Sequence, residues 1–156
     1  MTPAIKAAEG AGISYTLHEY HHDPETESYG MEAAENLGVD ADRVFKTLVV
    51  NLDGKELIVG MVPVDKKLSL KDLARAARGK KAIMADQKTV ERSTGYVLGG
   101  VSAMGQKKRL RTFIDASAEN VETLFISAGR RGLEIELAPA ALITVTQGAV
   151  APLQQA

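Results

Sequence analysis

Apolar and polar positions follow two different periods along this chain. Mostly apolar runs of strand length occupy 44–52 and 56–62, and the Asp53-Gly54 pair between them is typical of a tight hairpin turn. We therefore predict an antiparallel hairpin over 44–62. A two-residue period predicts further strands at 13–20 and 133–137, and strand-like composition predicts two more at 110–114 and 122–127.

Capping residues mark the helical segments. Thr2 before Pro3 supplies an N-cap and a proline at the first helical position. Ser69 stands three residues before Asp72, a variant of the capping box that opens an amphipathic helix. The expected helices are 3–9, 32–37, 70–77 and a last one that begins at Pro139.

Strands and short helices are interspersed without a regular strand–helix–strand rhythm. This order predicts an α+β fold with a mixed, barrel-like β-sheet and surrounding short helices. A chain of 156 residues with 45% hydrophobic content suits one domain over 1–156 with a sizeable core.

Composition removes several classes of function. With 19 Lys and Arg against 20 Asp and Glu, the molecule has no overall field for nucleic acid, so an RNA contact needs a local patch, and DNA is not expected. The lack of cysteine excludes a disulfide framework and thiolate zinc sites. No apolar window is long enough for a membrane span or a signal peptide, so we expect no membrane partner and a cytoplasmic location.

A glycine-dense loop, 93–109, combines hydroxyl groups with a cationic end. Backbone N–H groups beside positive charge suit a phosphorylated, carbonyl-bearing ligand, so we predict a binding loop. Gly100 and Gly105 have P-loop spacing, but Gln106 follows where that motif needs lysine. Ser102 lies one residue too far from Gly105 for a nucleophile elbow, and we expect it to hydrogen-bond a turn or a ligand.

Other polar residues leave alternatives open. His18, His21 and His22 stand near Asp23, but adjacent strand residues point to opposite faces, which favours a solvated strand end over a metal site. We expect neither a metal nor another cofactor.

The basic residues allow two interpretations. The dense basic run is either an ordinary solvated surface or a binding site for an RNA backbone; it consists of Lys107, Lys108, Arg109 and Arg111. Lys46 interrupts an apolar strand and either faces solvent or points into a cleft to hold a carbonyl or phosphate oxygen.

Several segments together resemble the YbaK-type Cys-tRNA(Pro) deacylases, relatives of the editing domain of bacterial prolyl-tRNA synthetases. The resemblance spans nearly the whole chain, in order, and the segments that carry it are 1–4, 18–24, 45–48, 85–86, 93–109 and 131–136. It implies an α+β fold and hydrolysis of the ester that joins a wrongly attached amino acid, chiefly cysteine, to the terminal ribose of proline tRNA.

The resemblance also implies roles for individual residues. The family's essential lysine falls on Lys46, and backbone N–H groups near Gly99 and Gly100 would stabilise negative charge on the carbonyl oxygen. The substrate pocket would be lined by Tyr20, Tyr29, Thr47, Ser102, Ser127 and Glu134, and tRNA would contact Lys107, Lys108 and Arg109. In the family the attacking group is the cysteine thiol of the substrate itself. Ala103 departs from the family pattern, which has proline there.

Two rival hypotheses follow from the same residues. One is a non-catalytic tRNA-binding or adaptor module on the same scaffold, with Ala103 in its favour; the retained Lys46 argues against it. The other is an enzyme acting on a small free ligand, which leaves the basic run without a role. Prolyl-tRNA synthetase is a partner that the resemblance suggests, because one modest basic patch offers little to read an acceptor stem with.

Overall fold

The computed structural model describes residues 1–25 and 29–156. Within them the α-helices are α1 (Pro3–Ala11), α2 (Tyr29–Leu37), α3 (Leu70–Ala76), α4 (Gln87–Thr94) and α5 (Pro139–Thr146), with short 3-10 helices at Ala41–Arg43 and Ala116–Asn120. The strands are β1 (Thr16–Glu19), β2 (Phe45–Leu52), β3 (Glu56–Pro63), β4 (Ala82–Met84), β5 (Arg111–Asp115), β6 (Leu124–Arg130), β7 (Leu133–Leu137) and β8 (Ala149–Ala151).

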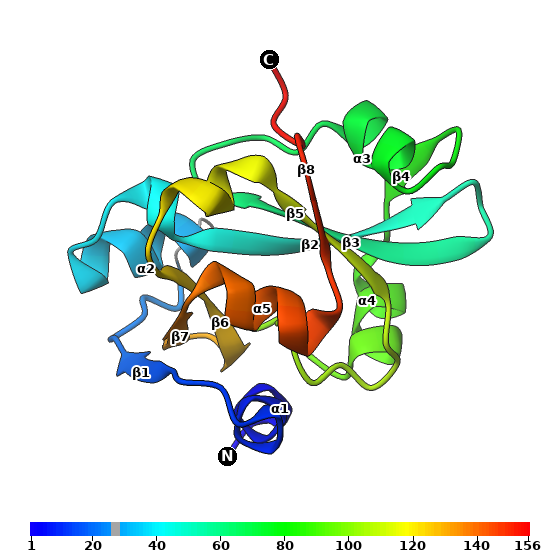
Figure 1. Ribbon diagram of the computed structural model, residues 1–156. Coiled ribbons are helices and arrows are strands. Elements are labelled where there is room, and N and C mark those ends of the chain that lie inside the picture. Colours follow the sequence, from blue (N-terminus) through cyan, green and yellow to red (C-terminus); the bar gives the residue numbers. More distant parts are fainter. Residues whose placement is uncertain (26–28) are drawn as a thin grey trace.

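The strands form two sheets (Figure 1). The larger has the order β4-β2-β3-β5-β8 and is mixed, because β2 pairs antiparallel with β3 and β4 whereas β5 pairs parallel with β3 and β8. The smaller sheet, β1-β7-β6, is antiparallel. The predicted α+β class is confirmed. The barrel-like closure is not found, since among the described residues the two sheets are joined only by an isolated bridge between Val44 and Phe125.

Apolar residues on the two faces of the larger sheet form separate cores. Odd-numbered residues of β2, such as Phe45 and Val49, face the smaller sheet and pack with Ile126 and Ile135. Even-numbered residues face the opposite way and pack with Leu73 of α3. This alternation follows from the two-residue period of a strand. It places β2 between both cores, with its first residues beside the smaller sheet.

The hairpin and the helix caps agree with the sequence. The register of β2 and β3 runs from Phe45 opposite Pro63 to Leu52 opposite Glu56. The Thr2 hydroxyl accepts a hydrogen bond from the Ile5 N–H at 3.2 Å, and the Ser69 hydroxyl accepts one from the Asp72 N–H at 3.1 Å. The predicted strand 13–20 is shorter, and the predicted helix 32–37 begins earlier, at Tyr29.

The sequence analysis missed α4, β4 and β8. α4 has Val90 as its one large apolar residue and therefore lacks a helical apolar stripe, although Asp86 caps its start through a 2.8 Å bond from the Thr89 N–H. β4 and β8 have three residues each and lie at the two edges of the sheet. Segments this short show no measurable period.

The glycine-dense loop is held at both ends. It leaves α4 at Gly95, and the N–H groups of Lys107 and Lys108 return to the carbonyl oxygens of Thr94 and Ser93 at 2.9 and 3.1 Å. Near its middle, a Cβ on Gly105 would lie 2.3 Å from the Pro3 carbonyl oxygen, so the loop packs directly on the backbone of α1. The first part of this loop therefore has a fixed position beside the smaller sheet. No helix in the described part of the chain has the length and apolar character to cross a membrane.

Candidate active site

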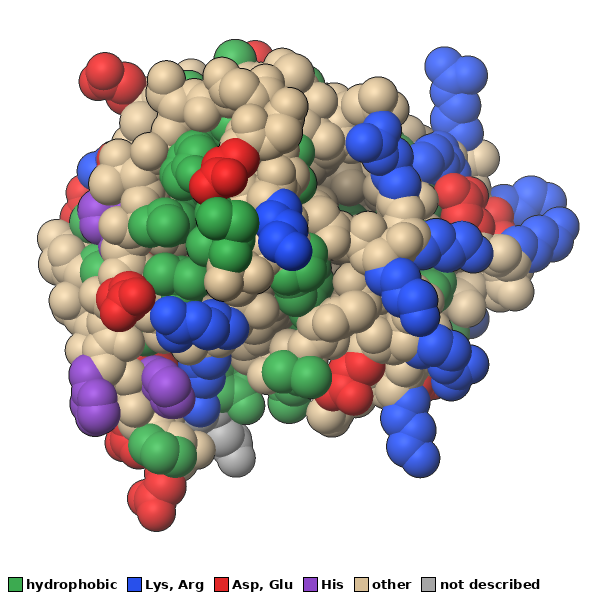
Figure 2. All heavy atoms as spheres, turned by 90° about the horizontal axis from the view of Figure 1, so that it is seen from below, with side chains coloured by type: hydrophobic (Ala, Val, Ile, Leu, Met, Phe, Trp, Pro, Cys, Tyr) green, Lys and Arg blue, Asp and Glu red, His purple; other side chains and the backbone are tan. Residues whose placement is uncertain are grey.

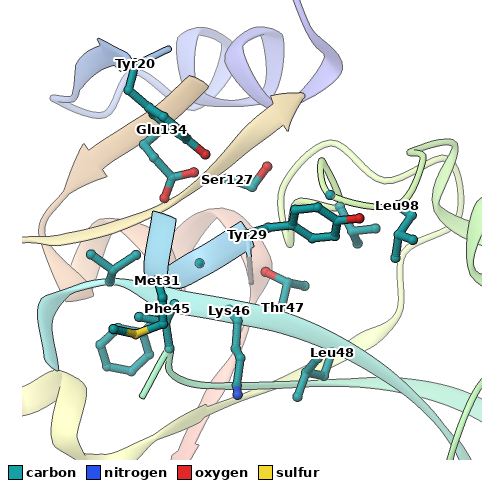
Figure 3. A pocket seen from close by; sticks show the side chains of 15 residues that line it. Tyr20, Tyr29, Met31, Phe45, Lys46, Thr47, Leu48, Leu98, Ser127 and Glu134 are labelled. Atoms are coloured by element: carbon teal, nitrogen blue, oxygen red, sulfur yellow. The ribbon is translucent and has the colours of Figure 1, made fainter. Parts of the chain in front are cut away.

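A cavity of about 330 Å³ opens between the first residues of β2 and the smaller sheet (Figure 3). Seven residues expected at a substrate site lie in its wall, from six separate segments: Tyr20, Tyr29, Lys46, Thr47, Gly99, Ser127 and Glu134. The rest of the wall is formed by Gly30, Met31, Val44, Phe45, Leu48, Val64, Leu98 and Val101. Side chains far apart in sequence thus meet in one place.

One end of the cavity holds a buried acid. Glu134 is 6% exposed, and no described residue hydrogen-bonds its carboxyl group. Burial raises the pKa of Glu134 to about 8, so the carboxyl group is mostly protonated at neutral pH and can donate a hydrogen bond. Tyr20 lies beside it (Figure 3), and burial, together with the charge of Glu134, raises the pKa of the Tyr20 phenol. The Ser127 hydroxyl accepts a 3.2 Å bond from the Gly129 N–H and keeps its own proton to donate.

Thr47 presents a second unused polar group. Its hydroxyl oxygen is buried and has no hydrogen-bond partner among the described residues, although the residue lines the cavity. An unpaired buried hydroxyl costs free energy, and native structures keep few of them. A ligand oxygen or nitrogen in the cavity would satisfy it.

Lys46 lies on the other side of β2 from Thr47, as the strand alternation requires (Figure 3). The side chain lines the cavity, and its amine points away from Glu134 and Ser127. Burial lowers the pKa of Lys46, nearby Asp65 opposes that change, and Lys67 adds to it. No described carboxylate forms an ion pair with Lys46, so its charge is available to a ligand.

Arg131 organises the wall opposite β2. Its guanidinium lies 4.4 Å from the centroid of the Tyr29 ring and 3.1 Å from the buried Glu32 carboxylate, and it also donates to the Asp23 carbonyl. A Cβ on Gly99 would lie 3.4 Å from the Arg131 Cδ. The sequence analysis assigned no role to Glu32 or Arg131, because their contacts with each other and with Tyr29 depend on the fold.

The glycine loop contributes less than expected. Val97 and Gly100 close a turn through a 3.0 Å bond from the Gly100 N–H to the Val97 carbonyl. That N–H is therefore used within the loop, which corrects its expected role as a donor to the substrate. Gly100 packs instead on the β6–β7 turn, where a Cβ would lie 2.7 Å from the Arg130 Cα. Gly99, with φ of +89°, occupies a left-handed position of the turn, and its N–H makes no hydrogen bond to a described residue.

Ser102 also lies outside the cavity wall. It is fully buried, and its hydroxyl accepts a 3.2 Å bond from the Met104 N–H. This contact makes Ser102 part of the internal bonding of the loop, which matches the expected turn role but not the expected substrate contact. Ala103 is buried beside it and lines a separate cavity of about 120 Å³.

The basic run divides into two parts. Lys107, Lys108 and Arg109 are exposed and lie outside the wall of the large cavity. Arg111 points elsewhere and forms two bonds with Glu56, at 2.8 and 2.9 Å, so it does not belong with them.

The histidine segment carries no sign of a metal site. The His18 ring lies 2.8 Å from the Glu136 carboxylate. Within the described ranges, no group of three or more His, Cys, Asp or Glu side chains could hold a metal ion.

Sequence reasoning also missed the apolar part of the cavity wall. Met31, Val64 and Leu98 stand at positions that a sequence pattern cannot distinguish from ordinary core or turn residues. Among the described residues, the cavity wall contains no cysteine or histidine, so it offers hydrogen-bond donors, one amine and one acid, without a nucleophile paired to an imidazole base. Such a site can hold a polar ligand and stabilise charge on a carbonyl oxygen.

Comparison with known proteins gives a consistent picture. Residues 23–145 match the family described as the aminoacyl-tRNA editing domain. An Enterococcus faecalis protein described as a "putative Cys-tRNA(Pro)/Cys-tRNA(Cys) deacylase", EbsC, is 36% identical over 97% of this chain and 92% of its own length. The uncharacterized protein YwhH of Bacillus subtilis is 34% identical over 74% of this chain and 73% of its own length.

Solved structures share the fold. A structure described as a "putative trans-editing enzyme for prolyl tRNA synthetase" matches with a TM-score of 0.81 at 21% identity, over 100% of this chain and 99% of the other. The hypothetical protein APE2540 matches with a TM-score of 0.86 at 23% identity, over 98% of this chain and 99% of the other.

Proposed function

The chain belongs to the aminoacyl-tRNA editing domain family, and from this premise we propose that it hydrolyses the ester bond of mischarged Cys-tRNA(Pro) in trans. The E. faecalis relative supports an aminoacyl-tRNA deacylase activity, and its name supports cysteine as the amino acid removed. We further propose that proline tRNA is selected together with prolyl-tRNA synthetase and that the protein acts in the cytoplasm.

One observation carries the proposal. The Thr47 hydroxyl and the Glu134 carboxyl group both lie in the cavity wall, both are buried, and neither has a hydrogen-bond partner among the described residues. Two unused polar groups in one cavity, together with Lys46, whose amine forms no ion pair with a described carboxylate, are suited to a small polar ligand. An aminoacyl group on a terminal ribose offers the carbonyl, ammonium and hydroxyl groups that such a wall can bind.

The proposed division of roles follows from position. The Gly99 N–H would donate to the carbonyl oxygen as negative charge develops on it, and the Thr47 hydroxyl would bond the ester or ribose. Lys46 would hold a phosphate or carbonyl oxygen as a point charge. Tyr20, Tyr29, Ser127 and Glu134 would enclose the amino acid.

The cysteine thiol of the substrate would supply the nucleophile. Its sulfur forms a bond to its own carbonyl carbon, the bond to the ribose oxygen breaks, and the thiol proton passes to that oxygen. The resulting cyclic thioester is then hydrolysed by water to free cysteine. This step needs no nucleophile in the cavity wall, and positioning of the thiol would provide much of the acceleration.

A comparison of two esters tests the proposal. Purified protein should release cysteine from Cys-tRNA(Pro) rapidly and leave Ser-tRNA(Pro) almost unchanged, because the two side chains have the same shape and a hydroxyl is a far weaker nucleophile than a thiol. Equal release of both amino acids would support the deacylase activity and contradict the attack by the substrate thiol. Release of neither by folded protein would reject the deacylase.

A further inference from the structure

A basic strip is formed by α4 and the end of the glycine loop. It consists of Lys88 and Arg92 on α4 with Lys107, Lys108 and Arg109 at the end of the glycine loop. The two hydrogen bonds from Lys107 and Lys108 to the last turn of α4 bring these two groups together. Figure 2 shows Lys and Arg side chains gathered along the side of the molecule on which α4 lies in Figure 1.

The cations of the strip are free to bind a ligand. All five are exposed, and none forms an ion pair with a described carboxylate. Several other arginines do form such pairs, among them Arg111 with Glu56 and Arg131 with Glu32.

Charge is also distributed unevenly along the chain. Residues 86–109 contain five Lys and Arg against two carboxylates, although the whole chain has a net charge of −1. Both of those carboxylates are engaged within α4, because Asp86 caps the helix and Glu91 accepts a bond from Gln87. The strip is therefore a local positive region on a neutral protein.

The chain on each side of α4 leads to a segment of the cavity wall. Ala85, just before the helix, donates a 3.1 Å hydrogen bond to the Val49 carbonyl, next along β2 to the cavity residue Leu48. After the helix, the chain reaches the cavity again at Leu98 and Gly99, in the turn that Val97 and Gly100 close. The helix is thus joined at both ends to segments that form or adjoin the cavity wall.

Two exposed apolar side chains follow α4 in the chain, just before the cavity residue Gly99. Val97 is 65% exposed and Leu98 is 56% exposed, and Leu98 also lines the cavity (Figure 3). The chain therefore presents, in order, cations, an apolar tip and a polar cavity. A nucleic acid ending in an aminoacyl ester has matching groups in the same order: phosphates, a terminal base and an esterified ribose.

We propose that this strip is the binding site for the 3′ end of tRNA. The five cations contact backbone phosphates, and the Val97–Leu98 tip packs against the terminal adenine. The inference rests on the proposed function, since it takes the esterified end of tRNA as the occupant of the cavity. It adds Lys88 and Arg92 of α4, which the sequence did not single out, and assigns the apolar tip to a base.

Binding of uncharged proline tRNA tests the cationic part. Each phosphate contact contributes about 0.7 to 0.9 to the slope of log affinity against log salt. The Lys88→Gln/Arg92→Gln variant should therefore bind roughly tenfold more weakly at 0.1 M salt, with a slope reduced by about 1.5. Lys71→Gln/Arg75→Gln is the matched control, because this exposed pair has the same spacing on α3, which packs on the other face of the larger sheet (Figure 1).

The control should bind like wild type, and thermal melting should show all three proteins folded. Equal tRNA binding by the α4 variant and wild type would overturn the inference, and so would equal weakening by both pairs. Neither outcome would contradict the proposed function. That function is tested separately by deacylation of Cys-tRNA(Pro) with the wild-type protein.

Removal of the terminal adenosine tests the apolar tip. Wild-type protein should lose affinity when tRNA lacks this nucleoside, and in Leu98→Ser that loss should shrink by roughly fivefold. An equal loss in both proteins would show that the base lies elsewhere and would overturn this part of the inference.

Discussion

The guanidinium of Arg131 lies 4.4 Å from the centroid of the Tyr29 ring, and the same guanidinium is 3.1 Å from the carboxylate of Glu32. One side chain from the β6–β7 turn therefore fixes the position of α2, which supplies Tyr29 to the cavity wall. The ion pair is nearly buried, with side-chain exposures of 16% and 7%.

Loss of this guanidinium should destabilise the protein. Arg131→Met leaves the buried Glu32 charge without its cation, and we expect a loss of about 3 kcal/mol in the free energy of unfolding. Arg130→Met is the control, because the ion pair of Arg130 with Glu19 is exposed and should contribute about 0.5 kcal/mol or less. Chemical denaturation measures both. Similar small effects in the two variants would show that the buried pair does not stabilise α2.

The Thr47 hydroxyl should matter for function and not for folding. Thr47→Val removes an oxygen that has no described partner, so the free energy of unfolding should stay within about 0.5 kcal/mol of wild type or rise. Deacylation of Cys-tRNA(Pro) should fall about tenfold or more.

Thr94→Val provides the comparison for that variant. The buried Thr94 hydroxyl donates to the Val90 carbonyl at 2.7 Å and accepts from the Tyr96 N–H at 3.1 Å. Its loss should cost about 1 to 2 kcal/mol. A destabilised Thr47→Val protein with normal activity would contradict the assigned role of Thr47.

Gly100 should tolerate no side chain. A Cβ there would meet the Arg130 backbone at 2.7 Å, so Gly100→Ala must displace the loop, with an expected cost of about 1 to 3 kcal/mol and reduced deacylation. Gly10 in α1 has nothing within 4 Å of its Cβ position, so Gly10→Ala should stabilise the protein by about 0.5 to 1 kcal/mol. Thermal melting compares the two, and a neutral Gly100→Ala would show that the loop does not rest on the β6–β7 turn.

Glu134 should make stability depend on pH. Its folded pKa of about 8 exceeds the ordinary value of 4.5, so the folded state holds the proton more tightly. The resulting stabilisation is complete below the ordinary value and is lost as the pH rises through about 8.

The free energy of unfolding of wild type should therefore fall between pH 5 and 8 relative to that of Glu134→Gln, whose amide does not titrate. Denaturant melts across this range measure the difference. A constant difference would show that the carboxyl group titrates normally in the folded protein.

The elements with strong local signals were predictable from the sequence. The 44–62 hairpin combines two apolar runs of strand length with an Asp-Gly turn, and α1 and α3 begin at the hydroxyl caps that the pattern indicates. α4 was not predictable from the sequence, because Val90 is its one large apolar residue and it has no apolar stripe. The separation into two open sheets depends on which strands pair across long distances, and no local pattern records that choice.

The cavity could be anticipated only through the family resemblance. Tyr20, Thr47 and Glu134 meet because β1, β2 and β7 lie close together, and nothing near each residue in sequence indicates the others. The roles expected for Gly100 and Ser102 depended on where an N–H and a hydroxyl point. Turn geometry determines both, and it directs them into the loop itself.

Release of labelled cysteine from Cys-tRNA(Pro), by wild type and by Lys46→Ala side by side, tests the central claim most directly, with Ala-tRNA(Pro) as the comparison ester. The account predicts rapid release of cysteine by wild type, little release of alanine, and loss of at least about a hundredfold in the Lys46→Ala rate. Unchanged release by a folded Lys46→Ala protein would contradict the assigned site, and no release by wild type would contradict the deacylase.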